Sequence, residues 1–520
     1  MSPTTVPVSS AVPGLRRNMV TICAMTATIM QALDTTIANV ALPYMQGSLS
    51  ASQDQINWVL TSYICAAAIM TAPVGWIANR FGRKRIFIIC SAGFTIASVM
   101  CGVAQDINQM VLFRLLQGVF GAALVPLSQA VMLDSYALHE RAKAMAIWGM
   151  GVMMGPIMGP SLGAWLTETY SWHWVFFVNI PFGIVTVAGL MIFMDETNKN
   201  LDLRFDWFGF LALAIGIGSL QVALDRGEQL GWLGSNEIIV EFIIAAVGFY
   251  YFFAHSFTTP KPFIQFAIFK DRNFVSGCVF MAVMGLVLYS TMALSSPYLQ
   301  NVIGYPIITA GLLLATRGSG TFVAMMLVGR LMKYIEARTL IIAGLSLTGF
   351  SLFYMTGWTD QTGVREIVMV SIVQGFGFGL VFVPLSTVAF LTLPNHLRTD
   401  GTSMLTLMRN VASSIGISVV IAQLTEGGRR DYAILSEHIN PFNQAMQMPN
   451  VRSMIDMSSD GGRALADAMV AIQAQIIAFS QDYQLVMFFI LGSIPLAIMI
   501  GSTKVALRSQ QAATEHAVID

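Results

Sequence analysis

Residues 151–163 read GVMMGPIMGPSLG, with a glycine at every fourth position from 151 to 163 and a proline directly after each of the middle two. The stretch lies within an apolar run from about 144 to 166. In a helix, such glycines share one face and admit a close neighbour, while each proline removes a backbone hydrogen bond and bends the rod. Static packing would use the same spacing, but the two prolines favour a helix that moves between two conformations. The residues of this predicted conformational motif are Gly151, Gly155, Pro156, Gly159, Pro160 and Gly163.

The composition is that of a chain that crosses a membrane many times. Of 520 residues, 55% are hydrophobic and 11% are charged, against roughly 25% charged in soluble domains. Apolar runs long enough to span a bilayer occur fourteen times along the chain. The five cysteines lie inside these runs without CxxC spacing, so we predict neither a disulfide nor a metal site. The net charge of zero gives no indication of nucleic-acid binding.

Two parts of the chain repeat each other. Residues 114–128 read RLLQGVFGAALVPLS, and residues 372–386 read IVQGFGFGLVFVPLS. At nearly the same spacing, HER at 139–141 matches HLR at 396–398, and the stretch from Gly75 has a weaker echo from Gly329. The repeat predicts an all-α membrane protein of two parallel six-helix halves with two helices inserted between them, an organisation used by transporters whose halves rock about a central site.

The repeat also predicts the order of segments along the chain. We expect a cytoplasmic tail at 1–18, the first half at 19–194, the inserted helices with flanking loops at 195–272, the second half at 273–503, and a cytoplasmic tail at 504–520. Lysines and arginines concentrate on the loops of one side, which places both termini in the cytoplasm. A long polar segment at 425–483 is then external, and it is either a docking surface for another protein or a capping loop.

Asp34 stands in the middle of the first predicted helix. A charged carboxylate there costs roughly 2.5 to 3.5 kcal/mol, so the side chain should face the bundle interior or take up a proton. We therefore predict that Asp34 carries the coupling proton, with Gln31 on the same helical face as a hydrogen-bond partner. The alternative is a structural carboxylate held by an arginine.

Arg114, in the fourth predicted helix, keeps its charge and needs an acceptor within reach. It either tunes the proton affinity of Asp34 or is a fixed packing element. Other polar or charged residues inside predicted helices are candidates for lining a substrate cavity. These candidates are Gln31, Gln117, Gln129, Arg317 and Arg409.

With these residues in place, the chain resembles the major facilitator superfamily, in its 14-helix drug:proton antiporter branch of the EmrB/QacA type. Residues 33–43, LDTTIANVALP, are similar to the helix 1 motif of that branch. The stretch Gly149–Gly163 is similar to the helix 5 motif of antiporters, Arg114–Gly121 to the helix 4 motif, and Gly75–Arg85 to the superfamily's loop 2–3 motif. The resemblance implies the major facilitator fold.

The loop 2–3 motif departs from the family pattern at one position. Asn79 stands where many members have Asp, and the resemblance implies that this Asp helps to latch the outward-facing state. Asn keeps hydrogen bonding but loses the charge, so we expect a weaker latch. Arg83 is expected to pair with Asp134, with a small contribution if the pair is solvated. The residues of this second conformational motif are Gly75, Asn79, Arg80, Gly82, Arg83 and Asp134.

The resemblance implies a proton-driven antiporter that exports amphipathic toxic compounds or drugs across a bacterial inner membrane. No phosphate-binding loop occurs, so the proton gradient is the expected energy source, without a cofactor or enzymatic activity. The alternative is an exporter of one native metabolite or lipid-like anion, held by Arg317 or Arg409. Besides the bilayer and small-molecule substrates, the long external segment implies a periplasmic adaptor protein and an outer-membrane channel as partners, and we expect no nucleic acid.

Overall fold

Pro73 breaks the second membrane span into two helices, α2 (Gln53–Thr71) and α3 (Val74–Phe81), which meet at an angle of 56°. Proline supplies no backbone N–H, so a helix running into it loses a hydrogen bond and bends. The computed structural model describes residues 14–137, 140–197, 199–201, 204–259, 262–394, 397–440, 443, 448 and 457–499. Within these residues, 13 helices are long and apolar enough to cross a membrane, or 14 when the bent pair is counted as one span. The predicted all-α membrane fold is confirmed.

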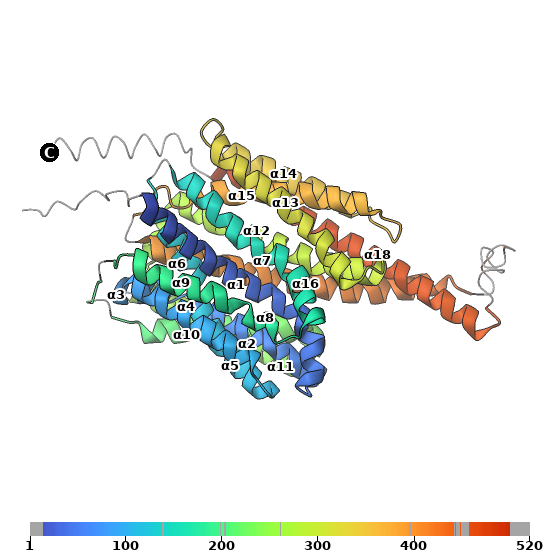
Figure 1. Ribbon diagram of the computed structural model, residues 1–520. Coiled ribbons are helices and arrows are strands. Elements are labelled where there is room, and N and C mark those ends of the chain that lie inside the picture. The colour runs from blue at the N-terminus through green and yellow to red at the C-terminus, as the bar shows by residue number, and fades with distance from the viewer. Residues whose placement is uncertain are drawn as a thin grey trace, which may run out of the picture.

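The helices before residue 200 pack together as a first helix group, at the blue to teal end of the chain in Figure 1. This group holds α2 and α3 together with α1 (Gly14–Ser48), α4 (Arg83–Gly102), α5 (Ile107–Gly121), α6 (Leu124–Ser135), α7 (Arg141–Thr169), α8 (Trp174–Phe177) and α9 (Asn179–Phe193). The helices after residue 271 form a second helix group. It holds α12 (Arg272–Pro297), η4 (Tyr298–Val302), α13 (Ile307–Leu331), α14 (Ala337–Met355), α15 (Val364–Val388), α16 (Arg398–Glu437), α18 (Asp460–Ser493) and η7 (Ile494–Met499).

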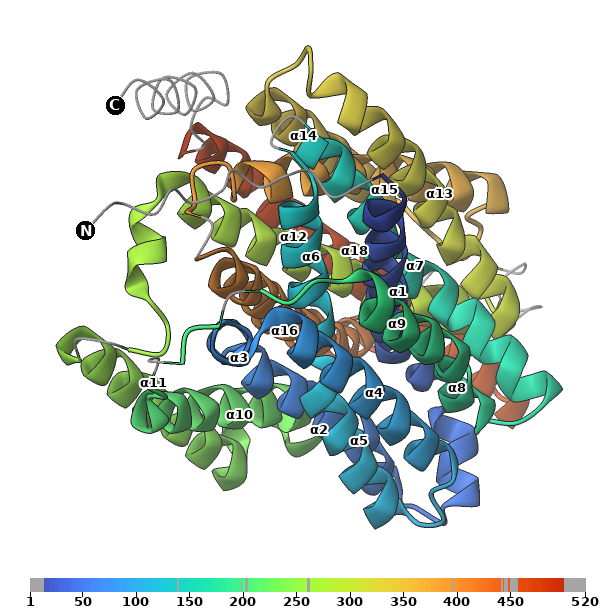
Figure 2. The ribbon, with the colours of Figure 1, turned by 60° about the vertical axis from the view of Figure 1, so that its left-hand side comes forward.

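Two further helices lie between these groups in sequence. They are α10 (Trp207–Leu230) and α11 (Asn236–Thr258), joined by the short η2 (Trp232–Gly234) and followed by η3 (Phe266–Lys270). In Figure 2, α10 and α11 run side by side along the outside of α2. α10 also contacts α16, so this pair touches both helix groups.

The polar segment at 425–483 differs from the loop that its sequence predicts. Residues 425–437 continue α16 to a length of 40 residues, and residues 460–483 belong to α18, which is 34 residues long. The two arms project past the rest of the molecule as a helical hairpin (Figure 1). Tyr432 donates to Asp467 and Gln481 donates to Asp431 across them, which holds the arms together. The polar surfaces of the two arms pair as helices do in a soluble protein. A search for apolar runs does not detect helices of this kind.

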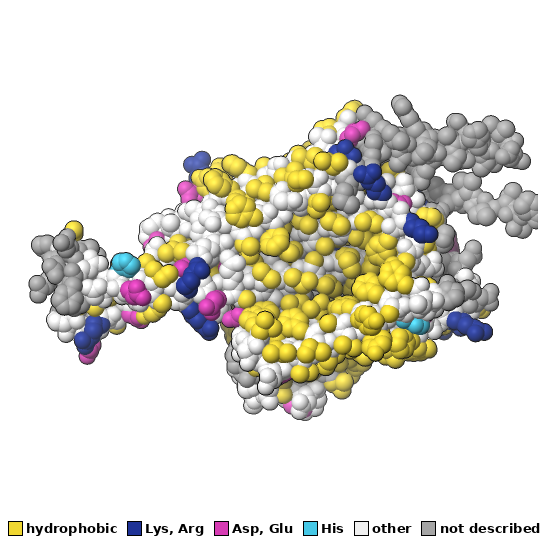
Figure 3. All heavy atoms as spheres, turned by 180° about the vertical axis from the view of Figure 1, so that it is seen from behind, with side chains coloured by type: hydrophobic (Ala, Val, Ile, Leu, Met, Phe, Trp, Pro, Cys, Tyr) yellow, Lys and Arg dark blue, Asp and Glu magenta, His cyan; other side chains and the backbone are white. Residues whose placement is uncertain are grey.

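The hairpin gives the molecule two distinguishable ends. We call the end from which it projects the hairpin end, and the opposite end, which carries α3, the α3 end. Between the ends, Figure 3 shows a broad band of hydrophobic side chains, with charged side chains gathered toward both ends. This distribution suits a protein that sits across a bilayer. The expected tails at 1–13 and 504–520, the hairpin tip at 441–442, 444–447 and 449–456, and the repeated His139 and His396 lie outside the described residues.

Candidate functional site

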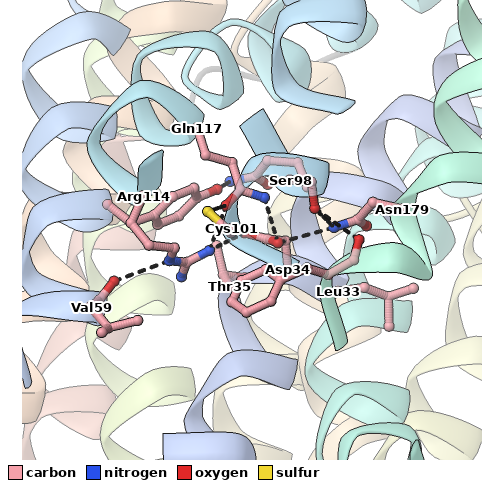
Figure 4. A network of polar contacts seen from close by, with 12 residues as sticks. Leu33, Asp34, Thr35, Val59, Ser98, Cys101, Arg114, Gln117 and Asn179 are labelled. Carbon is pink, nitrogen blue, oxygen red and sulfur yellow. Dashed lines mark hydrogen bonds and ion pairs between the residues drawn. The ribbon is translucent and has the colours of Figure 1, made fainter. Parts of the chain in front are cut away.

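Asp34 lies at the centre of a polar network inside the first helix group. Its side chain, on α1, is fully buried. One carboxylate oxygen accepts from Arg114 Nη1 on α5 at 2.8 Å. The other accepts from Gln117 Nε2 at 2.8 Å and from Asn179 Nδ2 on α9 at 3.0 Å. Figure 4 shows these side chains, from α5 and α9, converging on Asp34 of α1.

The guanidinium of Arg114 is fixed on several sides. Its Nε donates to the carbonyl of Val59 on α2 at 3.0 Å, and its Nη1 also donates to Gln117 Oε1 at 2.9 Å. The ring of Tyr63 lies 4.4 Å from the guanidinium carbon, in cation–π geometry. Arg114 therefore joins α1, α2 and α5 around one charge.

This geometry pairs the carboxyl of Asp34 with the guanidinium of Arg114 in the conformation described here. Three side-chain donors point at it in a fully buried place, and one of them is the permanently charged guanidinium of Arg114. Protonating Asp34 would leave Arg114 without its counter-ion, at a cost of about 3–5 kcal/mol for a broken buried pair. Asp34 can accept a proton only if these helices rearrange or water enters.

The cavity candidates of the first helix group lie in different surroundings. Gln117 is completely buried within the Asp34 network. Gln31 donates to the hydroxyl of Tyr63 at 3.4 Å and not, as the sequence analysis expected, to Asp34. Gln129, on α6, is also buried, and its Nε2 has no hydrogen-bond partner among the described residues. The three glutamines therefore do not converge on one another through any hydrogen bond in the described part of the chain.

The two arginine candidates of the second helix group carry buried charge without a carboxylate. Arg317, on α13, is 6% exposed and donates to Ser295 Oγ at 3.4 Å. Arg409, on α16, is 9% exposed, and its guanidinium reaches the side chain of Asn410 at 3.4 Å. Among the described residues, neither forms an ion pair, in contrast to Arg114. Each is suited to meet an anion.

At the α3 end, one carboxylate joins the two helix groups. Asp134, at the end of α6, pairs with Arg83 at the start of α4, as the sequence predicts. Its other oxygen accepts from Arg398 Nη1, at the start of α16, at 2.7 Å. Arg83 and Arg398 are both mostly buried, so these pairs are less screened than surface ion pairs. Arg398 extends the expected pair into a bridge between the groups.

Asn79 meets a carboxylate that the sequence analysis did not single out. Its Nδ2 lies 3.5 Å from Oδ2 of Asp400, in the first turn of α16. An added Cβ at Gly75 would lie 1.9 Å from Oδ1 and 2.7 Å from Cα of the same Asp400, so α16 fits against α3 only because position 75 has no side chain. A carboxyl group like the one that many family members have at position 79 thus lies on the opposite helix group, next to Asn79.

The remaining residues of the loop motif shape the turn from α3 to α4. Arg80 donates to the carbonyl of Leu201 at 3.1 Å and lies over the ring of Trp76. Gly82 takes a φ of +97°, which glycine adopts without the strain that a side chain would add. This turn positions Arg83 at the first residue of α4, next to Asp134.

The glycines of the helix 5 motif face α1. An added Cβ would lie 2.1 Å from the Ala32 carbonyl oxygen at Gly155 and 2.0 Å from Thr36 Oγ1 at Gly159. At Gly151 and Gly163 the nearest atoms belong to Met25 and Ile37, on the same face of α1. α7 continues as one helix through Pro156 and Pro160. The glycine face therefore holds α7 directly against the helix that carries Asp34.

The sequence analysis did not predict Asn179 as part of this network, because a neutral amide at the start of an apolar run costs too little free energy in a membrane to stand out. Arg398 is the last residue of the repeated HLR stretch and Asp400 lies two positions after it, so that repeat was the available signal for the second side of the α3-end bridge. Within the described parts of the chain, no three His, Cys, Asp or Glu side chains are grouped so that they could hold a metal ion.

Comparison with known proteins places this geometry in context. A family model described as Major Facilitator Superfamily matches residues 24–417. The chain is 34% identical over 466 residues to the multidrug export protein EmrB of Escherichia coli (strain K12), covering 89% of this chain and 90% of that protein. It is 32% identical over 484 residues to the fatty acid resistance protein FarB of Neisseria gonorrhoeae, covering 92% and 94%. Among solved structures, the proton:xylose symporter XylE matches with a TM-score of 0.57 at 13% identity, over 92% of this chain and 96% of that one, a likeness of fold alone.

Proposed function

Because the chain belongs to the major facilitator superfamily, we propose that it is a proton-driven antiporter that exports amphipathic toxic compounds or drugs from the cell by alternating access. The chain is an EmrB-like multi-pass membrane transporter of this superfamily and not an enzyme. The names of its relatives, a multidrug export protein and a fatty acid resistance protein, support an amphipathic cargo.

The observation that carries this proposal is the buried ion pair of Asp34 and Arg114. Its hydrogen bonds join α1, α2, α5 and α9, and α1 in turn packs on the glycine face of α7. Neutralising Asp34 with a proton removes the charge on which these contacts converge. Proton uptake is then coupled to a change in helix packing, as an antiporter requires.

The proton gradient supplies enough energy for export. One charge crossing a potential of 100 mV releases roughly 2.3 kcal/mol. Since about 1.4 kcal/mol corresponds to a tenfold change in an equilibrium constant, one proton sustains roughly a 50-fold gradient of a neutral solute. This is the scale on which exclusion of a toxic compound becomes useful to a cell.

The proposal is tested by substrate-evoked proton movement in reconstituted vesicles, with ethidium as substrate. Wild-type protein should move protons against the dye, and Asp34→Asn should abolish this movement because Asn carries no exchangeable acidic proton. Asp360→Asn, an exposed carboxylate at the hairpin end, is the matched control and should behave as wild type. Dye flux without proton movement in wild type, or normal proton movement in Asp34→Asn, would contradict the assignment.

We propose that the chain lies in a bacterial inner membrane with both termini and the α3 end in the cytoplasm. In this arrangement, residues 1–18 and 504–520 are cytoplasmic tails, 19–194 and 273–503 are the two halves, 195–272 holds the inserted helices, and 425–483 is periplasmic. Labelling of single cysteines placed at exposed Tyr334 and Tyr432 by a membrane-impermeant thiol reagent in whole cells tests this orientation. Labelling at 432 and protection at 334 are expected, and the reverse would overturn it.

The helical hairpin is a suitable docking element for a periplasmic adaptor protein, which in turn would meet an outer-membrane channel. Its arms project well beyond the apolar band and hold each other through polar contacts, so they remain ordered in water (Figure 1). Removing residues 438–459 and closing the arms with a short turn should leave vesicle transport intact while abolishing drug resistance in cells. Loss of transport in vesicles would show instead that the tip serves the transporter itself.

A second function is favoured by the unpaired arginines. Arg317 and Arg409 carry buried positive charge with no carboxylate partner among the described residues, as a site for one native metabolite or lipid-like anion requires. A transport panel of cationic dyes and long-chain fatty acids separates the two functions. Selective transport of anions that is lost in Arg317→Gln would establish this alternative, and broad transport of dyes would contradict it.

A further inference from the structure

Asp482 is a second carboxylate buried among membrane helices. It lies on α18 in the second helix group and is 0% exposed. Neither of its carboxylate oxygens has a hydrogen-bond partner among the described residues. The sequence analysis placed it at the edge of the external segment, so its burial is a finding of the structure.

The environment of Asp482 is the opposite of that of Asp34. Asp34 has three side-chain donors, one of them a guanidinium, and such donors stabilise an ionised carboxylate in a buried place. An ionised carboxylate without such partners is strongly disfavoured, because nothing replaces the water it has lost. A neutral carboxylic acid carries no net charge and is the form that this site can hold. Its burial and its lack of donors among the described residues therefore favour the protonated form.

The elements packed around Asp482 supply no charge that reverses this conclusion. The elements packed against α18 are α12, α14, α16, η4 and η7. Their titratable or charged side chains include Tyr289 on α12, Tyr298 on η4, Tyr354 and Arg338 on α14, and Arg429, Arg430 and Asp431 on α16, next to Tyr483 on α18 itself and Arg317 on α13. Arg317 donates to Ser295, and Arg430 and Asp431 are both bonded to Gln481. Tyr354 is largely exposed, and Arg338 donates to the Ile498 carbonyl. Among the described residues, Asp482 forms no ion pair.

A groove at the hairpin end opens toward the helix face that carries this carboxyl. A groove of about 490 Å³ lies at the base of the hairpin, between α16, α18 and η4. Gln475 and Phe479 of α18 line it, together with Asn301 of η4 and Arg429 of α16. Asp482 follows Phe479 by three residues and Gln475 by seven, so it lies on the same face of α18, about one helical turn further in. The groove therefore ends close to the level of Asp482 on the same face of the helix.

We propose that Asp482 is a second proton-binding site of the transporter, loaded from the hairpin end. In this conformation the proton resides on an Asp482 carboxylate oxygen as an O–H bond, while Asp34 is ionised. The proton comes from water in the groove and needs no further reactant. The inference rests on the proposed antiport for its role in coupling, while the protonation itself stands on the structure alone.

Infrared difference spectroscopy tests the protonation directly. Protein labelled with ¹³C at aspartate carboxyls, in lipid nanodiscs at neutral pH, should show the C=O stretching band of a buried carboxylic acid. Asp482→Asn should remove this band, whereas Asp34→Asn and Asp460→Asn, an exposed control on the same helix, should retain it. A band that is absent from wild type, or that survives in Asp482→Asn, would overturn the proposal.

Two further measurements separate the possible failures. Because Asn resembles a neutral carboxylic acid in shape and charge, Asp482→Asn should unfold at the wild-type temperature, whereas a clear drop would indicate an ionised carboxylate with a partner. In vesicles, the number of protons moved per ethidium should fall in Asp482→Asn, and an unchanged ratio would remove Asp482 from coupling. If wild-type vesicles move no protons at all, the antiport proposal fails, while the infrared band still reports on Asp482.

Discussion

Replacing Gly155 with alanine should force α7 and α1 apart. An added Cβ at this position would lie 2.1 Å from the carbonyl oxygen and 2.2 Å from the carbonyl carbon of Ala32, where ordinary contacts begin at 3.4 Å. The clashing atoms are backbone, so no side-chain rotation relieves them, and α1 must move by more than an ångström. This movement would also stretch the 3.0 Å hydrogen bond from Thr36 Oγ1 to the Gly155 carbonyl.

The size of the effect follows from two opposing terms. Overpacking of a well-packed interior typically costs about 1–3 kcal/mol. Alanine gains about 0.5–1 kcal/mol over glycine within a helix, which offsets part of this cost. Gly329→Ala is the matched control, since its Cβ would meet Lys143 Cα at 3.7 Å, an ordinary contact. Gly151→Ala is an intermediate case, because its nearest contact, at 3.0 Å, is the flexible end of Met25.

Thermal unfolding of purified protein in detergent, followed by tryptophan fluorescence, measures this series. The unfolding midpoint should be lowest for Gly155→Ala, close to wild type for Gly151→Ala, and equal to or above wild type for Gly329→Ala. Dye transport in vesicles should fall in the same order, because α1 carries Asp34. If Gly155→Ala is as stable and as active as Gly329→Ala, the close packing of α7 on α1 does not determine stability or transport.

Three further outcomes are expected. Asn79→Asp restores the residue common in the family but should weaken the contact between α3 and α16, because it places a second carboxylate beside Asp400. The double variant with Asp400→Asn should restore this contact, and cysteine accessibility at the α3 end measures both effects. Asp134→Asn should shift the population toward a form that is open at the α3 end, because Arg398 loses its 2.7 Å ion pair. Each 1.4 kcal/mol of lost contact energy corresponds to about a tenfold shift, which spin-label distances across that end measure. Arg317→Lys should retain and Arg317→Gln should lose any binding of anionic substrates in equilibrium dialysis, since only the charge is common to Arg and Lys.

The all-α fold was predictable because bilayer thickness fixes how long an apolar run must be. The same criterion fails for the helical hairpin. Residues 425–437 and 460–483 are polar enough to be read as a loop, yet they continue two membrane helices and stabilise each other through contacts such as Tyr432 with Asp467. Those contacts join positions that are distant in sequence, which a local pattern cannot show.

The central network was predictable in part. The cost of a charge inside a membrane identified Asp34 and Arg114, and the structure brings them together at 2.8 Å. Asn179 carries no charge and gives no such signal, although it supplies a third hydrogen bond to Asp34. Asp482 was overlooked for another reason, since the polar residues before it place it outside any apolar run. Its burial arises only from the packing of α18 against α12, α14 and α16.

The unbroken course of α16 has a mechanical consequence. At 1.5 Å per residue, its 40 residues make a rod of about 60 Å. The N-terminal end of the helix carries Arg398 and Asp400, which contact the first helix group at the α3 end. The C-terminal end forms one arm of the hairpin. A single rigid helix of this length connects the contacts at the α3 end with the hairpin at the other end of the molecule. If the adaptor proposed above binds the hairpin arm, a force on that arm would pass along α16 to the contacts of Arg398 and Asp400, so binding at one end of the helix would influence opening at the other.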